Sequence, residues 1–160
     1  VSKGRDVITV GEEIEIVRNY LTIQKVRYPD IFEVEYEVDP DLRHYPIPKL
    51  VLQPLVENCL YHGIRPKGTG GTIRICARKA EGAVRIAVSD DGIGMTDEEI
   101  TRILRTERKG QIKSFGLWGT IERLRIFYKD RNVLKIDSEP GNGTTITLLI
   151  PCGEEALWTN

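Results

Sequence analysis

The stretch of sequence that decides the fold begins LVENCLYHG at residues 55–63 and ends DDGIGM at residues 90–95. At about 3.6 residues per helical turn, Leu55, Asn58 and His62 share a narrow stripe of one helix, and apolar residues flank that stripe. An amide and an imidazole are costly to bury without partners. The polar pair is therefore predicted to face inward or into a cleft. Taken alone, the helix favours a simple cap contact and a core histidine bonded to a backbone carbonyl.

Pro54 affects the start of this helix. Proline has no backbone N–H to donate, so the helix is predicted to begin or kink at this residue. Residues 50–53 are then expected to form a separate turn.

Much of the remaining chain alternates apolar and polar residues in short runs, which is typical of strands with one buried face. Strands are predicted over residues 32–38, 73–78, 84–89, 133–138 and 144–150. Glu81-Gly82 and the sequence PGNG at 140–143 supply the turns of two hairpins.

Helices are predicted in the intervals and must cover the apolar face of the strands. Their expected ranges are 12–28, 55–62, a short helix from residue 96, and 117–128. Ile14, Val17 and Leu21 form the apolar stripe of the first helix, and Thr96 with Glu99 forms a capping box at the start of the third. The expected fold class is a two-layer α/β sandwich.

Two charged regions are expected at the surface. Glu12, Glu13 and Glu15 indicate an exposed face of the first helix. The long irregular stretch between about residues 105 and 115 is a candidate lid. Its basic side chains could steer phosphate groups, although ordinary surface charge on a solvated loop explains each of them equally well: Arg105, Arg108, Lys109 and Lys113.

Composition narrows the function classes. The chain of 160 residues is 40% hydrophobic, which suffices for one buried core, and its formal net charge of −1 argues against bulk binding to nucleic acid or an anionic membrane. We expect neither a membrane span nor a signal peptide, because no run of about 18 apolar residues occurs and the first residues lack an apolar region. Cys59, Cys76 and Cys152 are widely spaced, which indicates reduced thiols in a cytosolic setting.

Asp90 stands at the end of a predicted strand and is followed by Gly92 and Gly94. A carboxylate there can accept a hydrogen bond from an exocyclic amine, and glycines let the backbone turn sharply and approach a flat ring. An Asp-Gly turn at a strand end is common, so the motif alone is weak evidence. The order of motifs strengthens it, because Gly116 precedes a helix and GNGTT at 141–145 opens the last strand.

In this order the motifs resemble the ATP-binding catalytic domain of sensor histidine kinases, which belongs to the GHKL superfamily with gyrase, MutL and the heat-shock ATPase chaperone. The chain is most similar to the LytS/YesM-type kinases. The similar segments are IPKLVLQPLVENCLYHGI at 47–64, DDGIGM at 90–95, IERLRIFYKD at 121–130 and SEPGNGTTITLLIP at 138–151. The resemblance implies the Bergerat ATP-binding fold, a mixed and mostly antiparallel sheet with helices on one face.

The resemblance also implies a domain organisation. Residues 31–153 would form the ATP-binding catalytic domain. Residues 1–30 would be a linker helix at the end of the phosphoacceptor region, because NYLTIQKVRYPD at 19–30 is similar to that region in the family. Residues 154–160 would be a C-terminal tail.

Each matching residue acquires an implied role. Asn58 would offer its side-chain oxygen to Mg²⁺, which bridges phosphate oxygens, and His62 would support the phosphate end of the site as a second catalytic residue. Asp90 would accept a hydrogen bond from the adenine amine of ATP. The other implied nucleotide contacts are Gly92, Ile93, Gly94, Met95, Gly116, Leu117, Thr144 and Thr145.

Four positions depart from the family pattern. Ser114 replaces a glycine and Gly119 a common asparagine, so the motif at the end of the lid is half present. Tyr61 replaces a residue that is often basic, which removes one phosphate contact. Pro54 stands where the hydrolytic relatives have a glutamate, and this favours a phosphoryl donor, because a kinase gains nothing from activating water.

The implied function is that of the catalytic domain of a two-component sensor histidine kinase, which binds Mg-ATP and transfers the γ-phosphate to a histidine. The two histidines present, His44 and His62, show no phosphoacceptor pattern. The chain is therefore expected to bind ATP without phosphorylating itself. The implied partners are an upstream phosphoacceptor and dimerisation domain of the same protein, a response regulator, and a second copy of the full-length protein, located in the plasma membrane with this domain in the cytoplasm.

Two other functions stay open. One is a non-catalytic module that senses or docks nucleotide. The other is a GHKL ATPase or an anti-sigma-type serine kinase, which would share the nucleotide motifs. Phosphotransfer to a supplied acceptor domain would separate these functions.

Overall fold

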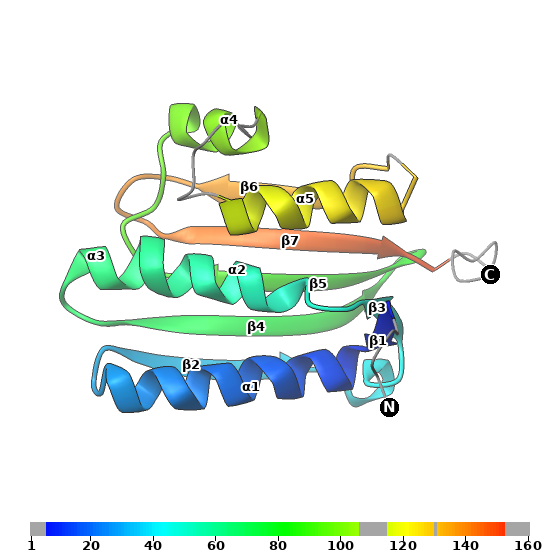
Figure 1. The fold of residues 1–160 in the computed structure, drawn as a ribbon, viewed down its shortest axis with the longest axis horizontal. Helices are drawn as coiled ribbons and strands as arrows, with labels where there is room; N and C mark the ends of the chain where they lie inside the picture. Colours follow the sequence, from blue (N-terminus) through cyan, green and yellow to red (C-terminus); the bar gives the residue numbers. More distant parts are fainter. Residues whose placement is uncertain (1–5, 106–114, 130, 153–160) are drawn as a thin grey trace.

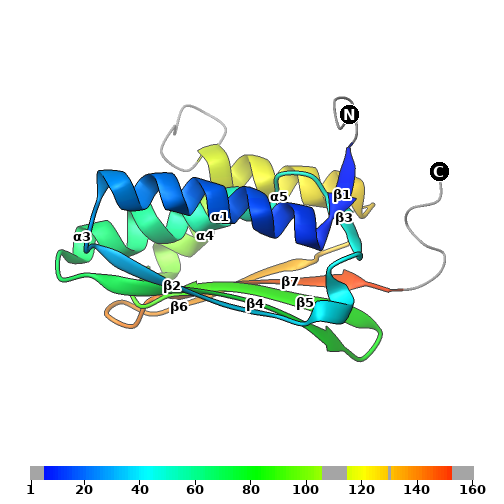
Figure 2. The ribbon, with the colours of Figure 1, turned by 90° about the horizontal axis from the view of Figure 1, so that it is seen from below.

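A five-stranded sheet with helices on one face forms the protein (Figure 1). The computed structural model describes residues 6–105, 115–129 and 131–152. The sheet runs in the order β2-β4-β5-β7-β6. Its strands are β2 (Phe32–Val38), β4 (Gly71–Ala80), β5 (Ala83–Asp90), β6 (Leu134–Ser138) and β7 (Thr144–Pro151). The two-layer sandwich predicted from the alternation of residues is confirmed (Figure 2).

The sheet is mixed, as expected. β2 and β4 pair in parallel, whereas the pairs β4–β5, β5–β7 and β6–β7 are antiparallel. Both predicted hairpins are present, with turns between β4 and β5 and between β6 and β7. The outer face of β2 carries exposed glutamates, of which Glu35 pairs with Arg74 of β4 at 2.8 Å. One face of the sheet therefore stays polar while the other packs under the helices.

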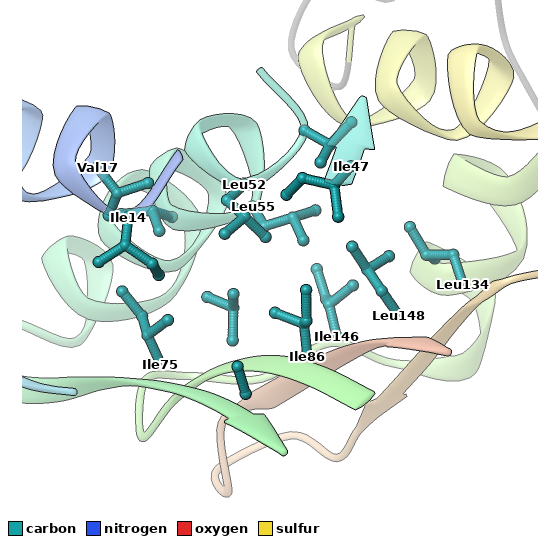
Figure 3. Packing of buried hydrophobic residues seen from close by; sticks show 14 of the residues in the cluster. Ile14, Val17, Ile47, Leu52, Leu55, Ile75, Ile86, Leu134, Ile146 and Leu148 are labelled. Carbon is teal, nitrogen blue, oxygen red and sulfur yellow. The ribbon is translucent and has the colours of Figure 1, made fainter. Parts of the chain in front are cut away.

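The helices lie on one side of the sheet and differ in length (Figure 2). Its helices are α1 (Val10–Arg27), α2 (Leu52–Asn58), the π-helical segment η2 (Cys59–Ile64), α3 (Arg65–Lys67), α4 (Asp97–Arg105) and α5 (Phe115–Phe127). A small second sheet pairs β1 (Val7–Thr9) with β3 (Pro46–Pro48), and a 3₁₀ turn, η1 (Pro40–Leu42), lies between β2 and β3. The core fills the space between the layers: Ile14 and Leu55 of the helices face Ile75, Ile86 and Leu148 of the strands (Figure 3).

Helix α1 is an integral part of the sandwich. Thr9 and Glu12 form a capping box at its start, with the Glu12 N–H donating to Thr9 Oγ1 at 3.0 Å. Ile14, Val17 and Leu21 are buried in the shared core, as their spacing predicts. The apolar stripe of α1 therefore belongs to the same core cluster as the buried residues of α2 and the sheet.

The start of α2 differs from the prediction. The helix begins at Leu52 and includes Pro54 in its first turn, so residues 50–53 do not form a separate turn. The first four N–H groups of a helix have no partner within the helix, and a proline there costs no hydrogen bond. The capping box of α4 is confirmed, since the Glu99 N–H donates to Thr96 Oγ1 at 3.1 Å.

Glu13 is not on an exposed face as predicted. It is 0% exposed, and its two carboxylate oxygens accept hydrogen bonds from the backbone N–H groups of Leu50 and Leu52, each at 2.9 Å. Burial raises the pKa of Glu13, and the backbone donors oppose that rise. Glu12 and Glu15 are exposed, as expected.

Two predicted segments cannot be compared with the structure. The candidate lid, apart from its two ends, lies outside the described residues, and so does the predicted C-terminal tail at residues 154–160. Within the described ranges, no helix is both long enough and apolar enough to cross a bilayer.

Candidate functional site

The site begins at the end of β5, where Asp90 closes the strand. Asp90 is 7% exposed, and its Oδ1 accepts a hydrogen bond from the Gly92 N–H at 2.8 Å. Its Oδ2 is buried and has no hydrogen-bond partner among the described residues. A buried carboxylate oxygen without a donor is costly, so it marks a place where a ligand can supply the missing donor.

The surroundings of Asp90 favour its protonated form. Burial raises the pKa of Asp90, and hydrogen bonding from the Gly92 N–H, the Cys59 thiol and the Thr144 backbone opposes that rise. The fully buried thiol of Cys59 lies beside the carboxylate. Burial raises the pKa of Cys59 and the negative charge of Asp90 raises it further, so the thiol stays neutral. A neutral thiol is only a weak donor and leaves the acceptor capacity of Asp90 for a better one.

The neighbouring Asp91 has a different function. Its Oδ1 accepts a hydrogen bond from the Thr72 N–H at 2.8 Å, and the ammonium group of Lys67 donates to its carbonyl oxygen at 2.9 Å. Asp91 therefore ties α3 and the start of β4 to the end of β5. The two consecutive carboxylates therefore differ. Asp91 is bonded to Thr72 within the protein, whereas one carboxylate oxygen of Asp90 has no hydrogen-bond partner among the described residues.

Gly92 lies against the backbone of the helical layer. A Cβ at this position would stand 2.1 Å from the carbonyl carbon of Gly63, and the Ile93 N–H donates to the Gly63 carbonyl oxygen at 3.0 Å. The sequence predicts that this glycine admits a flat ring, whereas in the described structure it admits another stretch of backbone. Gly63 was not identified from the sequence. Its position in His62-Gly63, just before the end of the apolar helix, is the signal that could have identified it.

The segment after Gly92 is fixed to the β6–β7 hairpin. Gly94 has φ of +74°, and a Cβ there would stand 2.0 Å from the carbonyl oxygen of Glu139, so both the conformation and the packing require glycine. The Met95 N–H donates to Ser138 Oγ at 2.8 Å. Ile93, three positions after Asp90, is 43% exposed, so its apolar side chain is open to solvent.

The two threonines at the start of β7 separate. Thr144 pairs with Asp90 in the ladder and is buried, with its Oγ1 at 2.7 Å from Ser138 Oγ. Thr145 pairs with Ser89, and successive residues of a strand point to opposite faces of the sheet. The structure therefore brings Thr144 together with Asp90 on the helix-covered face, and it does not bring Thr145 there. Ser138 was not identified as a site residue from the sequence.

Asn58 and His62 lie on opposite sides of a change in helix type. Asn58 ends α2 and is half-buried, whereas His62 lies within the π-helical segment and is exposed. His62 is open to solvent while Asn58 is partly covered, so the two side chains do not share the inward-facing environment expected of them. The alternative of a core histidine is wrong, because His62 is at the surface. Single-turn π segments are frequent at functional sites.

Tyr61 points away from this side of the helix. Its hydroxyl donates to Gln24 Oε1 of α1 at 3.0 Å, and the guanidinium of Arg65 lies 4.9 Å from its ring centre. The residue that departs from the family pattern therefore joins α1 to the π-helical segment.

The start of α5 provides the remaining predicted residues. Gly116 is exposed in the first turn of α5, where backbone N–H groups have no partner within the helix and can bind an anion. Leu117 is 4% exposed and belongs to the core cluster, so it fixes the helix against the core. Ser114 lies outside the described residues.

A magnesium ion would need ligands beyond the protein. Among the described residues, no group of three or more His, Cys, Asp or Glu side chains could hold a metal ion. The side-chain oxygen of Asn58 is a hard ligand of the kind that Mg²⁺ accepts, and Mg²⁺ is commonly bound through few protein ligands together with substrate phosphates. The donor set therefore fits a metal that arrives with its nucleotide.

A groove of about 620 Å³ lies elsewhere, at the start of α1, and includes Thr9, Arg43, His44 and Leu50 among its lining residues. It contains none of the residues predicted for the nucleotide site. His44 is exposed there, next to η1.

Most of the chain is similar to known proteins. Residues 46–154 match the family described as histidine kinase-, DNA gyrase B- and HSP90-like ATPases. Sensor histidine kinase YesM of Bacillus subtilis is 39% identical over 153 residues, which cover 96% of this chain and 25% of that protein. Sensor protein LytS of Bacillus anthracis is 31% identical over 154 residues, covering 93% of this chain and 26% of that protein. The chain thus spans about a quarter of the length of these relatives.

Solved structures show the same fold. The catalytic domain of the histidine kinase ThkA, in a nucleotide-free form, superposes with a TM-score of 0.62 at 21% identity, and the match covers 91% of this chain and 93% of that one. At this identity the likeness concerns the fold alone.

Proposed function

Because the chain belongs to the family of histidine kinase-, DNA gyrase B- and HSP90-like ATPases, and is an ATP-binding catalytic domain of the histidine kinase type, we propose that it donates the γ-phosphate of Mg-ATP to a histidine of a phosphoacceptor domain. The observation that carries the assignment of the site is the buried, unpartnered Oδ2 of Asp90. An adenine amine would supply the donor that this oxygen lacks.

The adenine base of ATP would lie against the end of β5, which we call the base end of the site. Asp90 would accept from the amine, and Thr144 on the same face would hold a water beside it. Ile93 and Met95 would contribute apolar contact to the ring. Gly92 and Gly94 act through the backbone, because they bring the loop close enough to Gly63 and Glu139 to hold Asp90 in place.

The phosphates would lie toward the helices. Asn58 would hold Mg²⁺ through its side-chain oxygen, and the metal when bound would neutralise charge on the phosphate oxygens. The free N–H groups at the start of α5, near Gly116 and Leu117, would bind phosphate, and His62 would support this end from the surface of the π-helical segment. The exposed position of His62 allows it to contact a bound triphosphate or an incoming domain.

The reaction needs little covalent work from this chain. Phosphoryl transfer is catalysed mainly by positioning and by charge neutralisation, and the imidazole of the acceptor is itself the nucleophile. Pro54 lies in the first turn of α2, so this position offers no carboxylate to activate water. A donor domain that binds ATP without hydrolysing it is the expected result.

The site is tested by nucleotide selectivity. ATP should bind more tightly than GTP, whose ring carbonyl replaces the amine. Asp90→Ala should weaken ATP binding by about 1–3 kcal/mol, because the adenine amine would be buried without an acceptor. The same change should abolish the preference for ATP over GTP. Calorimetry that finds equal ATP affinity for the wild type and Asp90→Ala would show that the site is misplaced.

The metal role of Asn58 has its own test. Asn58→Ala should weaken Mg-ATP binding while leaving metal-free ADP binding nearly unchanged, because only the link between metal and protein is removed. Equal losses with and without magnesium would indicate a structural role instead.

Phosphotransfer decides between a kinase and a sensing module. Incubated with labelled ATP, the chain should accumulate no phosphohistidine, whereas a supplied upstream acceptor domain with its own histidine should become labelled. Labelling of His44 would contradict the assignment of the acceptor. Tight ATP binding without transfer to any supplied acceptor would favour the nucleotide-sensing module. The homodimer, the response regulator and the membrane location of the full-length protein belong to the same proposal, supported by the multidomain sensor kinases among the relatives.

A further inference from the structure

A buried charged group lies at the opposite end of α2 from Asn58. Glu13 of α1 is 0% exposed, and its carboxylate accepts the N–H groups of Leu50 and Leu52 at 2.9 Å each. Leu52 is the first residue of α2, and Val51, its N-cap residue, makes no side-chain cap hydrogen bond. Glu13 therefore caps α2 from a different helix, and its negative charge stands at the positive end of the α2 dipole.

A second charged group holds the same turn from the other side. The guanidinium of Arg123 on α5 donates to the Leu50 carbonyl oxygen at 3.0 Å and to the Lys49 carbonyl oxygen. Arg123 also opposes the rise in the pKa of Glu13 through its positive charge. Donor and acceptor groups of residues 49–52 are thus bound by α1 on one side and by α5 on the other.

The turn between these groups adopts a backbone conformation that leucine rarely has. Leu50 has φ of +59°. Its side chain is 41% exposed, so burial of that side chain does not explain why the backbone adopts this conformation. A non-glycine residue in this region is maintained only when its surroundings fix it. The hydrogen bonds to Glu13 and Arg123 supply that fixation.

We propose that Glu13 and Arg123 are positioning residues that set α2 relative to α5 and so hold Asn58 opposite the start of α5. From Leu52 to Asn58, α2 spans about 9 Å, and a helix of this length transmits a shift at one end to the other. We call the pair Glu13 and Arg123 the clamp. The base end of the site is fixed by the pairing of β5 with β7 and meets the helical layer at Gly63, beyond α2, so the clamp should affect it less than it affects Asn58. The inference rests on the proposed placement of the phosphates near Asn58 and Gly116.

The test compares ligands that reach one or both ends of the site. Arg123→Met should weaken ATP binding about tenfold in the presence of magnesium and leave AMP binding within about twofold, because only a triphosphate spans to Asn58 and α5. Arg125→Met is the matched control, since Arg125 lies on the same helix and forms an ion pair with Glu122 at the surface. The control should change neither affinity.

Two further variants separate positioning from loss of fold. Arg123→Lys keeps the charge but not the two-pronged donor, and Glu13→Gln keeps the shape but removes one acceptor. Both should lower the ATP affinity selectively and by less than Arg123→Met. Hydrogen exchange should accelerate at the amides of residues 52–64 in all three variants and stay unchanged in β5.

Failure of this inference is distinguishable from failure of the proposed function. If Arg123→Met matches Arg125→Met in the ratio of ATP to AMP affinity and in hydrogen exchange at α2, the clamp does not position the helix. If ATP and AMP weaken equally in the clamp variants, the role is purely structural and the inference is also overturned. If Asn58→Ala proves insensitive to magnesium while the clamp variants still discriminate ATP from AMP, the metal assignment fails and the positioning role holds.

Discussion

The two ends of the candidate site are held by different kinds of secondary structure. At the base end, Asp90 is held by strand pairing, by the Gly92 N–H and by close backbone contact with Gly63. At the phosphate end, Asn58 stands on a seven-residue helix that continues as a π-helical segment, and the helix is capped by a side chain of another helix. Strand ladders fix positions through many backbone bonds, whereas the helix depends on a few side chains.

This difference predicts how each end responds to mutation. Changes at the base end should alter the stability of the empty domain together with the affinity for every adenine nucleotide. Changes at the phosphate end should alter the affinity for triphosphate and leave the fold largely intact. The predictions below test the base end, and the variants of Asn58, Glu13 and Arg123 described above test the phosphate end.

The largest effect is expected from Gly92→Ala. The new Cβ would stand 2.1 Å from backbone carbon of Gly63, which cannot rotate aside, so the free energy of unfolding should fall by about 3 kcal/mol. Denaturant titration measures this loss, and both ATP and AMP should bind poorly. Gly119→Ala in α5 is the control, since a Cβ there meets nothing within 4 Å and should stabilise the helix by about 0.5–1 kcal/mol. Equal stability of the two variants would contradict the close approach of the loop.

Asp90→Asn should change affinity and stability in opposite directions. The carboxamide keeps the shape but presents an N–H₂ group, so ATP affinity should fall about tenfold or more. Because burial raises the pKa of Asp90 in the folded state, the stability of the empty fold falls as the pH rises from the ordinary aspartate value to that raised value, and it stays lower above it. The neutral variant avoids this cost, and its melting temperature at neutral pH should rise by roughly 2–4 °C per 1 kcal/mol gained. A variant that loses both affinity and stability would mean that the carboxylate is structural.

The pH dependence of ATP binding isolates the same carboxylate. As the pH falls through the raised pKa of Asp90, the carboxylate gains a proton and loses its capacity to accept from the amine. The wild type should therefore lose ATP affinity at a higher pH than an ordinary aspartate with a pKa of about 3.9 would cause. Asp90→Asn should show a flatter profile by calorimetry over the same range. Parallel profiles would assign the titration to another group.

The smallest effect distinguishes the two faces of the sheet. Thr144→Val removes the hydroxyl that lies 2.7 Å from Ser138 Oγ on the face of Asp90, and should weaken ATP binding by about 1 kcal/mol. Thr145→Val alters the opposite face and should leave the affinity unchanged. Fluorescence titration with a labelled ATP analogue can compare the pair. A larger loss for Thr145→Val would place the base on the wrong face.

Local patterns were sufficient to predict most of the elements. Alternation over residues 32–38 and 144–150 predicts strands with one wet face, and the capping box at Thr96 and Glu99 predicts the start of α4. Both patterns involve residues that are only a few positions apart, so they can be recognised without knowing which distant residues are in contact.

Other features depended on contacts that a single sequence does not reveal. Glu13 reads as part of an acidic surface run beside Glu12, yet it is buried because its carboxylate caps α2, which begins 39 positions later. His62 is predicted to face inward with Asn58, yet it is exposed within a π-helical segment, and no residue type signals that change of helix type.

The sequence by itself determined the order of strands and helices, the polar outer face of the sheet, and the identity of Asp90 and Asn58 as residues placed against ordinary packing. These follow from periodicity and from the cost of polar groups in apolar surroundings, which act locally. Only the tertiary structure decided which of two adjacent aspartates lacks a partner, which of two adjacent threonines shares its face, and how α1 and α5 together hold α2. Those outcomes depend on which backbone groups meet across the fold, and a donor or acceptor is satisfied or left open only once its neighbours in space are set.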